Sequence, residues 1–286
     1  MRLGAVVPQL EIGSDPSGIA RWARAVEGMG YRHVLAYDHV LGADPAPRPG
    51  WRGYTHQDLF HEVFVLFGYL AAITESVELV TGVLILPQRQ TALVAKQAAE
   101  VDVLSRGRLR LGIGVGWNPV EYEALGEDFG TRGARSEEQI EVLRALWAEP
   151  TITYQGRWHT VVDAGLEPRP PRGGIPIWIG GTAEPVLRRV ARIGDGWLPQ
   201  QPPDAESAAT LERLRGYVAE AGRSPDDVGI EARITLANVP REERADFVAG
   251  WADLGATHLC VSTMGLGFTD IDQHLEALSE VLAEVG

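Results

Sequence analysis

Short runs of apolar, often β-branched residues alternate along the chain with longer stretches in which apolar residues recur at helical spacing. These runs predict eight strands, at 3–8, 33–39, 78–86, 109–117, 176–181, 197–200, 229–237 and 258–264. Each strand precedes a stretch that predicts a helix, at 17–29, 57–75, 91–106, 136–148, 184–193, 205–222, 241–254 and 270–285. The strands lack clean alternation, as expected of parallel strands covered on both faces. Eight β/α units predict an α/β fold, a closed (β/α)8 TIM barrel, and we expect one domain over residues 1–286.

Two segments depart from a minimal barrel. Residues 40–56 form a long loop rich in proline and glycine after the second strand, and loops of this length in compact domains are usually functional or mobile. Residues 151–160 predict a small hairpin that turns at Gln155 and Gly156, before the fifth strand. We expect both segments to be insertions into the barrel and not domain boundaries.

Composition and charge narrow the function. With 45% hydrophobic and 23% charged residues, the chain has the composition of a folded globular protein. Its single cysteine, Cys260, excludes an internal disulfide and a thiolate zinc cluster. The formal net charge of -13 argues against nucleic acid or an anionic membrane as a partner, because both require a basic surface. The sequence shows neither a signal-peptide profile nor an apolar stretch near the roughly 20 residues of a membrane span, so we expect a cytoplasmic enzyme with a small-molecule substrate.

The best catalytic candidates lie at the end of the second strand. Barrels of this type build their active site from the C-terminal ends of the strands. Asp38 and His39 form the one acid and base pair at such a position. Histidine titrates closest to neutral pH, so His39 is the candidate general acid or base. The alternative is that His39 only bonds a loop carbonyl while Asp38 caps the loop, and the motif alone leaves the two interpretations even.

Glycines mark the end of the fourth strand. Gly112, Gly114 and Gly116 occupy every second position, so they lie on one side of the strand and offer a flat ligand close approach. The structural alternative is a small-residue strand that makes room for bulky neighbours in the barrel. A dinucleotide-binding fingerprint does not fit, because three β/α units come first and the third glycine is missing.

Two glycine-containing loops are candidates for binding a phosphate. Gly180, Gly181 and Thr182 precede a helix, whose first-turn amides favour anions, although Thr182 is equally an ordinary N-cap. Gly265 and Gly267 after the last strand are a rival, and these arguments leave the two loops equal. Carboxylates and histidines show no metal-site spacing, so we expect no metal.

Six short segments carry a further signal: YDHV at 37–40, LVTGVL at 79–84, KQAAEVD at 96–102, GRLRLGIGVGW at 107–117, IWIGG at 177–181 and GDGW at 194–197. In their order and strand placement they resemble the bacterial luciferase-like monooxygenase superfamily, and specifically its branch that uses the deazaflavin coenzyme F420. The resemblance runs nearly from end to end.

This resemblance implies a function and a catalytic site. It implies hydride transfer between F420 and a small organic substrate, with His39 facing the ring of the cofactor and Asp38 orienting the loop. Trp117 stands where the sugar-phosphate dehydrogenases of the family have an acidic residue, which argues against a sugar-phosphate substrate. We expect five residues to line the substrate pocket: Trp51, Tyr54, His56, Trp117 and Gln200.

The resemblance also implies a cofactor site. It places a non-proline cis peptide between Gly82 and Val83 behind the ring, and the phosphate loop at Gly180 and Gly181, which favours these glycines over the rival loop. The expected cofactor-binding residues are Thr81, Gly82, Val83, Gly114, Gly116, Asn118, Gly180, Gly181 and Thr182.

Two other functions remain open. One is an FMN-dependent monooxygenase of the same fold that uses dioxygen, and the other is a barrel that binds a flavin without turnover. We further expect a homodimer and, as the source of reduced cofactor, a separate reductase.

Overall fold

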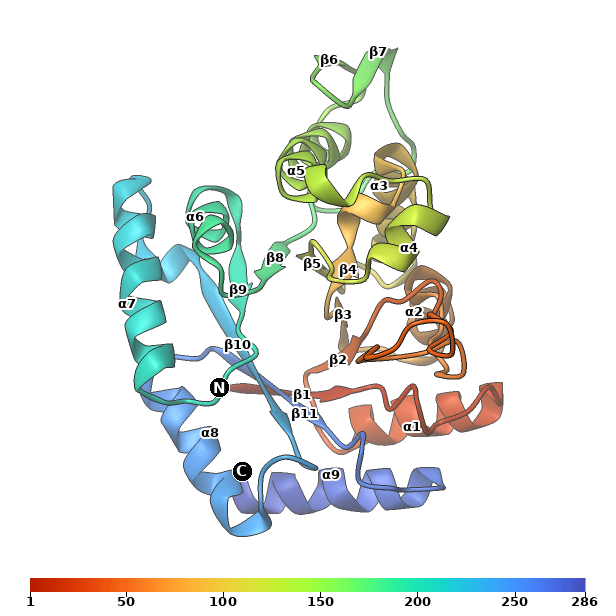
Figure 1. Cartoon of the computed structure of the whole chain (residues 1–286), viewed down its shortest axis with the longest axis vertical. Coiled ribbons are helices and arrows are strands. Elements are labelled where there is room, and N and C mark those ends of the chain that lie inside the picture. Colours follow the sequence, from red (N-terminus) through yellow and green to blue (C-terminus); the bar gives the residue numbers. More distant parts are fainter. Residues whose placement is uncertain (286) are drawn as a thin grey trace.

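The computed structural model describes residues 1–285 and confirms the closed parallel barrel (Figure 1). The ring runs in the order β3, β2, β1, β11, β10, β9, β8, β5, and β3 also pairs with β5, which closes it. The strands are β1 (Arg2–Val6), β2 (His33–Ala36), β3 (Glu78–Thr81), β4 (Leu84–Ile85), β5 (Leu109–Gly114), β8 (Ile177–Gly180), β9 (Gly196–Leu198), β10 (Gly229–Thr235) and β11 (His258–Ser262). Because β3 and β4 both pair with β5, they share one of the eight strand positions of the barrel.

Helices surround the strands (Figure 1). They are α1 (Pro16–Gly28), α2 (Val63–Ile73), α3 (Thr91–Leu104), α4 (Pro119–Ala124), α5 (Arg132–Ala148), α6 (Glu184–Ile193), α7 (Ala205–Glu220), α8 (Arg244–Asp253) and α9 (Ile271–Val285), with 3-10 turns η1 (Leu86–Gln88), η2 (Phe129–Thr131), η3 (Pro225–Asp227) and η4 (Arg241–Glu243). Their inner faces bury large side chains such as Trp22, Trp147 and Trp251, which form the main core against the strands. In the described part of the chain, no helix is both long and apolar enough to cross a membrane.

Three of the predicted boundaries were wrong in their details. Helix α2 begins at Val63 and not at 57, because Glu62 has an extended backbone and its side chain accepts the N–H of Val65 as an N-cap. Helix α5 begins at Arg132, directly after the turn η2, and not at 136. The predicted strand 78–86 is interrupted at the cis peptide between Gly82 and Val83, as the resemblance implied.

The hairpin insertion projects from the barrel at the top of Figure 1. It pairs β6 (Ile152–Gln155) with β7 (Thr160–Ala164) in antiparallel fashion, so its second strand extends beyond the predicted end at 160. The carboxylate of Glu138 on α5 accepts the backbone N–H groups of the hairpin turn and lies 2.8 Å from Nδ1 of His159. These contacts fix the insertion against α5.

The interior of the barrel has a charged layer near the N-terminal ends of the strands. Arg110 donates to Glu78 at 2.8 Å and also to Glu231, whose other oxygen lies 2.7 Å from Nε2 of His33. Burial by itself raises the pKa of Glu231, but His33 and Arg110 outweigh it and hold that pKa well below its usual range. Above this layer lies an apolar one, formed by Val6, Leu35, Val80, Cys260 and Met264. The apolar layer packs directly on the buried charges, because Sγ of Cys260 lies within 4.8 Å of the polar side-chain atoms of His33 and Glu231.

Candidate active site

A cavity of about 600 Å³ opens at the C-terminal mouth of the barrel. It brings together eleven of the residues predicted for the site: Asp38, His39, Gly82, Val83, Gly114, Gly116, Trp117, Gly180, Gly181, Thr182 and Gln200. Tyr37 from the end of β2 and Arg233 from β10 also line it, although the sequence did not single them out. Strand ends that lie far apart in sequence therefore meet at one site.

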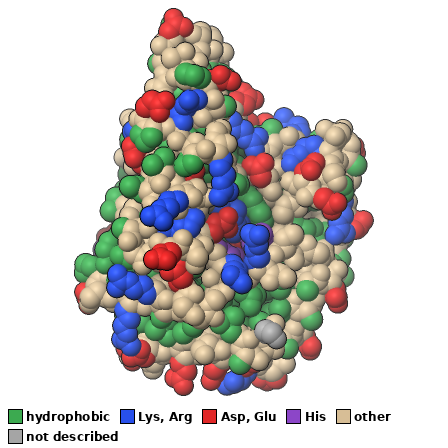
Figure 2. Space-filling model, turned by 180° about the vertical axis from the view of Figure 1, so that it is seen from behind, with side chains coloured by type: hydrophobic (Ala, Val, Ile, Leu, Met, Phe, Trp, Pro, Cys, Tyr) green, Lys and Arg blue, Asp and Glu red, His purple; other side chains and the backbone are tan. Residues whose placement is uncertain are grey.

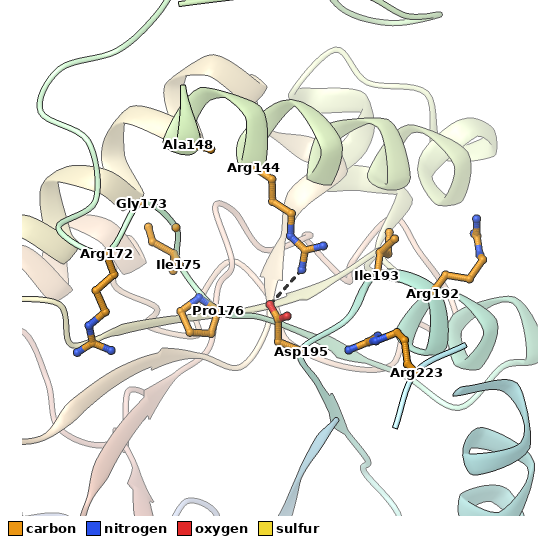
Figure 3. A pocket seen from close by; sticks show the side chains of 11 residues that line it. Arg144, Ala148, Arg172, Gly173, Ile175, Pro176, Arg192, Ile193, Asp195 and Arg223 are labelled. Atoms are coloured by element: carbon orange, nitrogen blue, oxygen red, sulfur yellow. Dashed lines mark hydrogen bonds and ion pairs between the residues drawn. The ribbon is translucent and has the colours of Figure 1, made fainter. Parts of the chain in front are cut away.

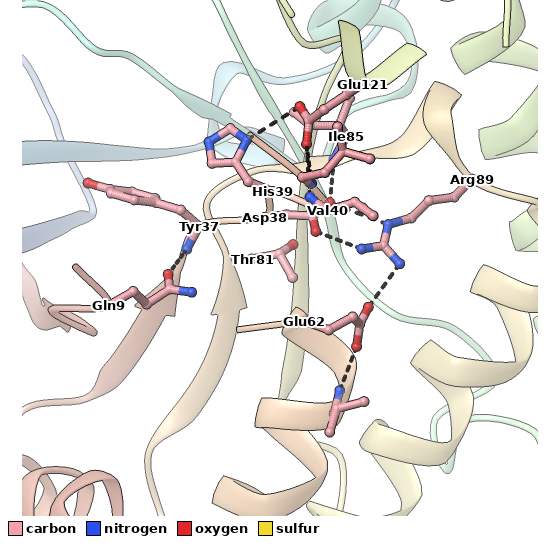
Figure 4. A network of polar contacts seen from close by, with 12 residues as sticks. Gln9, Tyr37, Asp38, His39, Val40, Glu62, Thr81, Ile85, Arg89 and Glu121 are labelled. Atoms are coloured by element: carbon pink, nitrogen blue, oxygen red, sulfur yellow. Dashed lines mark hydrogen bonds and ion pairs between the residues drawn. The ribbon is translucent and has the colours of Figure 1, made fainter. Parts of the chain in front are cut away.

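The ring of His39 is held between other side chains. It lies against Tyr54 with the ring centroids 3.7 Å apart, and Phe60 packs edge-on at 4.6 Å. Nδ1 faces the carboxylate of Glu121, 3.6 Å from Oε2 (Figure 4). Nε2 therefore remains on the side of the ring that faces away from Glu121, as expected of a group that exchanges a proton with a ligand.

Glu121 fixes this arrangement. Its side chain is buried, and Oε1 accepts the backbone N–H groups of Val40 at 2.8 Å and Leu41 at 3.3 Å. Oε2 accepts the hydroxyl of Tyr54. Burial raises the pKa of Glu121, but its contacts with His39, Tyr54 and the loop backbone outweigh burial and leave that pKa below its usual value. An ionised carboxylate at this position favours a proton on Nδ1 of His39.

Asp38 points to a different partner. Its carboxylate accepts the backbone N–H of Ile85 at 3.0 Å and the guanidinium of Arg89 at 2.6 Å, and Arg89 also donates to Glu62 at 2.9 Å (Figure 4). These bonds tie the end of β2 to β4 and to the start of α2. Asp38 therefore holds the main chain that carries His39.

The glycines of β5 face protein atoms. A Cβ on Gly114 would lie 2.5 Å from Val83, and one on Gly116 would lie 2.7 Å from Ile85. Gly180 is also constrained, because its Cβ would lie 2.9 Å from Val83. These glycines make room for Val83 and Ile85, and Gly114, Gly116 and Gly180 themselves line the cavity, so their role as cofactor-binding residues stays a prediction.

The loop at Gly181 fits an anion. Gly181 has a φ of +119°, and its carbonyl accepts the indole N–H of Trp197 at 2.7 Å. The N-cap of α6 is Ala183, which has no side-chain cap, so the interpretation of Thr182 as an ordinary N-cap is wrong. In the first turn of α6, Pro185 has no N–H and the N–H of Val186 donates to the carbonyl of Ala183 at 2.8 Å. The backbone N–H groups that precede this turn, at Thr182 and Ala183, lie beside the cavity, an arrangement that suits a phosphate.

The rival loop does not suit an anion. The backbone N–H of Gly265 donates to the carboxylate of Glu11 at 2.8 Å. An acidic side chain therefore occupies the position where a phosphate would have to lie, and the geometry favours the loop at Gly181.

These features can be compared with known proteins. The family model described as luciferase-like monooxygenase matches residues 3–280. The chain belongs to the luciferase-like monooxygenase family.

Relatives of this luciferase-like chain include one from Mycobacterium tuberculosis that is 33% identical over 215 residues, 73% of this chain and 74% of the relative, and is itself uncharacterised. An F420-dependent glucose-6-phosphate dehydrogenase of Microbacterium testaceum is 28% identical over 248 residues, 85% of this chain and 70% of the relative. Among solved structures, an F420-dependent secondary alcohol dehydrogenase in complex with an F420-acetone adduct has a TM-score of 0.81 at 18% identity, covering 100% of this chain and 99% of that one. This last likeness shows the fold alone.

Two residues predicted to bind the cofactor of the luciferase-like protein do not line the cavity. Thr81 is buried, and its hydroxyl donates to the carbonyl of Gly112 at 2.6 Å. Asn118 is also buried, where it caps α4 and donates to the hydroxyl of Tyr54 at 2.8 Å. Both side chains are satisfied by protein groups and support the wall of the cavity.

Three residues predicted to line the substrate pocket also lie outside the cavity wall. Tyr54 packs behind His39, and Trp51 lies against Trp117 with the ring centroids 5.6 Å apart, so both belong to an aromatic cluster around the site. His56 is exposed, and its backbone N–H donates to the carbonyl of Ala43. The long loop thus contributes mainly support for His39 and Trp117 in this luciferase-like site.

Glu121 and Arg89 are the polar residues that the sequence analysis missed. Glu121 lies three residues after Asn118 at the start of a helix, a spacing that indicates a capping box, and nothing local points to its contact with a loop 81 residues earlier. Arg89 follows a 3-10 turn and shows no pattern that pairs it with Asp38.

Proposed function

We propose that the chain is an F420-dependent oxidoreductase that transfers a hydride between the deazaflavin coenzyme and a small organic substrate. The observation that carries the proposal is a single cavity that joins the imidazole of His39, oriented by Glu121, to the uncapped N-terminus of α6. The curated relative named for its use of F420 supports the choice of cofactor.

Each part of the cavity has a role in this proposal. Bound F420 would supply the carbon that accepts or donates the hydride. Gly181 and the first turn of α6 would hold an anionic tail, and Val83 would form the wall behind the ring. His39 would move a proton at Nε2 to or from the substrate oxygen, while the aromatic cluster of the loop keeps water from the imidazole.

The test is a pair of titrations with a matched variant. We expect apo-protein to bind F420 and, with a panel of small secondary alcohols, to reduce it. His39→Ala should keep the affinity for F420 and lower kcat by about 10²-fold. If the parent protein binds the cofactor but turns over no substrate of a broad panel, the chain is a non-catalytic flavin-binding barrel.

The second candidate is an FMN-dependent monooxygenase that uses dioxygen. The description of the matching family as luciferase-like monooxygenase favours it, and the loop at Gly181 suits the phosphate of FMN as well as the tail of F420. Micromolar or tighter binding of FMN together with no binding of F420 would select this function over the first. In that case we propose a separate reductase as the source of reduced cofactor.

We also propose that the protein forms a homodimer in the cytoplasm. Val65 on α2 and Leu93 and Leu104 on α3 expose 72%, 51% and 60% of their surface, and the two helices lie side by side. A second copy is the occupant that we propose for this apolar surface. Light scattering tests the dimer, and Leu104→Glu should shift it to monomer.

A further inference from the structure

The mouth of the barrel contains a cation whose charge the chain leaves uncompensated. Other arginines that are at least partly buried either face a carboxylate, as Arg89 faces Asp38 at 2.6 Å, or donate to backbone carbonyls, as Arg108 donates to Val77 at 2.6 Å. Arg233 on β10 is partly buried and lines the mouth cavity, yet within residues 1–285 no carboxylate lies within ion-pair distance of it. It also borders a small cavity of about 20 Å³ beneath the mouth.

Two acids that share a strand or a cavity wall with Arg233 are already engaged. Glu231 precedes it by two residues, on the same side of β10, but accepts from Arg110 and lies 2.7 Å from His33. Asp38 lines the same mouth cavity and is paired with Arg89.

The guanidinium instead lies over an aromatic ring. Its central carbon is 5.2 Å from the centroid of Tyr37, and the main chain of Tyr37 is fixed by a hydrogen bond from its N–H to the side chain of Gln9 at 2.8 Å. A cation–π contact holds a guanidinium in place without neutralising it. Arg233 is thus a positioned cation that faces the space where a ligand would bind.

We propose that Arg233 binds an anionic oxygen of the molecule that occupies the mouth. A guanidinium recognises such an oxygen through charge-assisted hydrogen bonds. Two sources share this chemistry: a carboxylate on the substrate, or the negatively charged ring system of the reduced cofactor. The second source rests on the proposed function, whereas the first requires only the cavity.

The other large cavity provides a contrast and a control. It measures about 690 Å³ and lies at the N-terminal ends of β8 and β9 (Figure 3). There Arg144 is paired with Asp195 at 3.0 Å, and Arg192 is paired with Glu137 at 2.6 Å. Arg172 on its rim is exposed, so Arg172→Met removes the same charge far from the mouth.

The first arm of the experiment uses apo-protein and matched pairs of probes. Calorimetry compares benzoate with benzamide, and acetate with acetamide, on the wild type, Arg233→Met, Arg233→Lys and Arg172→Met. For a substrate carboxylate we expect Arg233→Met to weaken binding of the carboxylates at least tenfold and to leave the amides unchanged. Arg233→Lys should retain part of the preference, and Arg172→Met should retain all of it.

The second arm titrates oxidised and reduced F420, and the same two forms of FMN, into the same four proteins. If the anion belongs to the reduced cofactor, Arg233→Met weakens binding of the reduced form at least tenfold and that of the oxidised form less than threefold. Thermal unfolding of each variant checks that it is folded.

The two arms together decide the outcome. A loss of binding affinity in either arm that occurs in Arg233→Met but not in Arg172→Met supports the proposal and identifies the source of the anion. If Arg233→Met behaves like Arg172→Met in both arms, Arg233 binds no anion and the inference is wrong. If the wild type binds neither F420 nor FMN, the proposed function fails, while the carboxylate arm still judges Arg233 on its own.

Discussion

At the base of the barrel Arg110, Glu78, Glu231 and His33 contact one another, whereas at the mouth His39 and Arg233 each leave one side open to a cavity. The charges at the base are paired within the protein and pack against an apolar layer. At the mouth, His39 is positioned by Glu121 and Arg233 by the ring of Tyr37. The same kinds of side chain thus pair with one another at one end, whereas at the other we propose that they contact a ligand.

The surface charge follows no such division. Figure 2 shows acidic and basic side chains interspersed over one face, with arginine and lysine gathered near its middle, although the whole chain has a net charge of -13. What distinguishes the base of the barrel from its mouth is whether each charged side chain has a partner within the protein. This difference can be tested by replacing single charged residues at either end.

The largest effect should come from the base. Arg110→Met leaves Glu231 and Glu78 without their cation, and removing one partner of a buried ion pair costs about 3–5 kcal/mol in the free energy of unfolding. Urea denaturation measures it. The double variant Arg110→Met/Glu231→Gln should lose less free energy of unfolding than the two single variants lose in sum. A loss below about 1 kcal/mol for Arg110→Met would show that the base does not depend on its ion pairs.

The next effect concerns catalysis at the mouth. Glu121→Gln keeps an acceptor for the loop backbone but removes the charge beside His39, so we expect kcat to fall about tenfold, equivalent to about 1.4 kcal/mol. The matched control is Glu138→Gln, which removes the carboxylate from another histidine pair, at the hairpin. A kcat that matches the parent value would reduce Glu121 to a support for the loop.

A smaller effect is expected at the loop before α6. Both Gly181→Ala and Gly181→Asp meet the same backbone strain at a φ of +119°, so their difference isolates the added charge. Gly181→Asp should bind the cofactor about fivefold more weakly than Gly181→Ala, the effect of about 1 kcal/mol that a charge has at a helix N-terminus. Equal affinities of the two variants for F420 and FMN would exclude a phosphate at this loop.

The smallest effect returns to the base and depends on pH. Burial, followed by Arg110 and His33, lowers the pKa of His258 to about 3, whereas the unfolded chain has a histidine pKa of about 6.5. Between these two values the unfolded state binds one more proton, so stability falls as the pH falls from about 6.5 to 3. His258→Asn should reduce this fall, by about 2–3 °C in Tm at pH 6. The exposed His56, changed to Asn, should leave the pH dependence of Tm as it is.

Much of the fold follows from local pattern. The alternation of apolar runs and helical stretches predicted all eight β/α positions, because each unit buries its own apolar face against the ring. The interruption between β3 and β4 leaves no trace in that pattern. Gly82 and Val83 continue an apolar run, and only the resemblance to a family indicated the break.

The site was harder to predict. The rule that barrel sites lie at strand ends found His39 and the loop at Gly181, because a strand end is a local property. The same rule missed Glu121 and Arg233, for different reasons. Glu121 acts on a loop far away in sequence, and Arg233 lies in the middle of a strand, where the alternation of side chains does not reveal which face lines the interior of a closed barrel.

Glu121 has a consequence for how this scaffold can diversify. One carboxylate accepts the backbone N–H groups of residues 40 and 41 and the hydroxyl of Tyr54, and it also faces His39. Replacing the loop after β2 therefore also disturbs the imidazole that we propose as the proton carrier. Loop exchange therefore cannot alter substrate preference independently of acid and base chemistry. Gln200 lines the same cavity but makes none of these contacts with Glu121, so variation there avoids this linkage and is the better starting point for directed evolution.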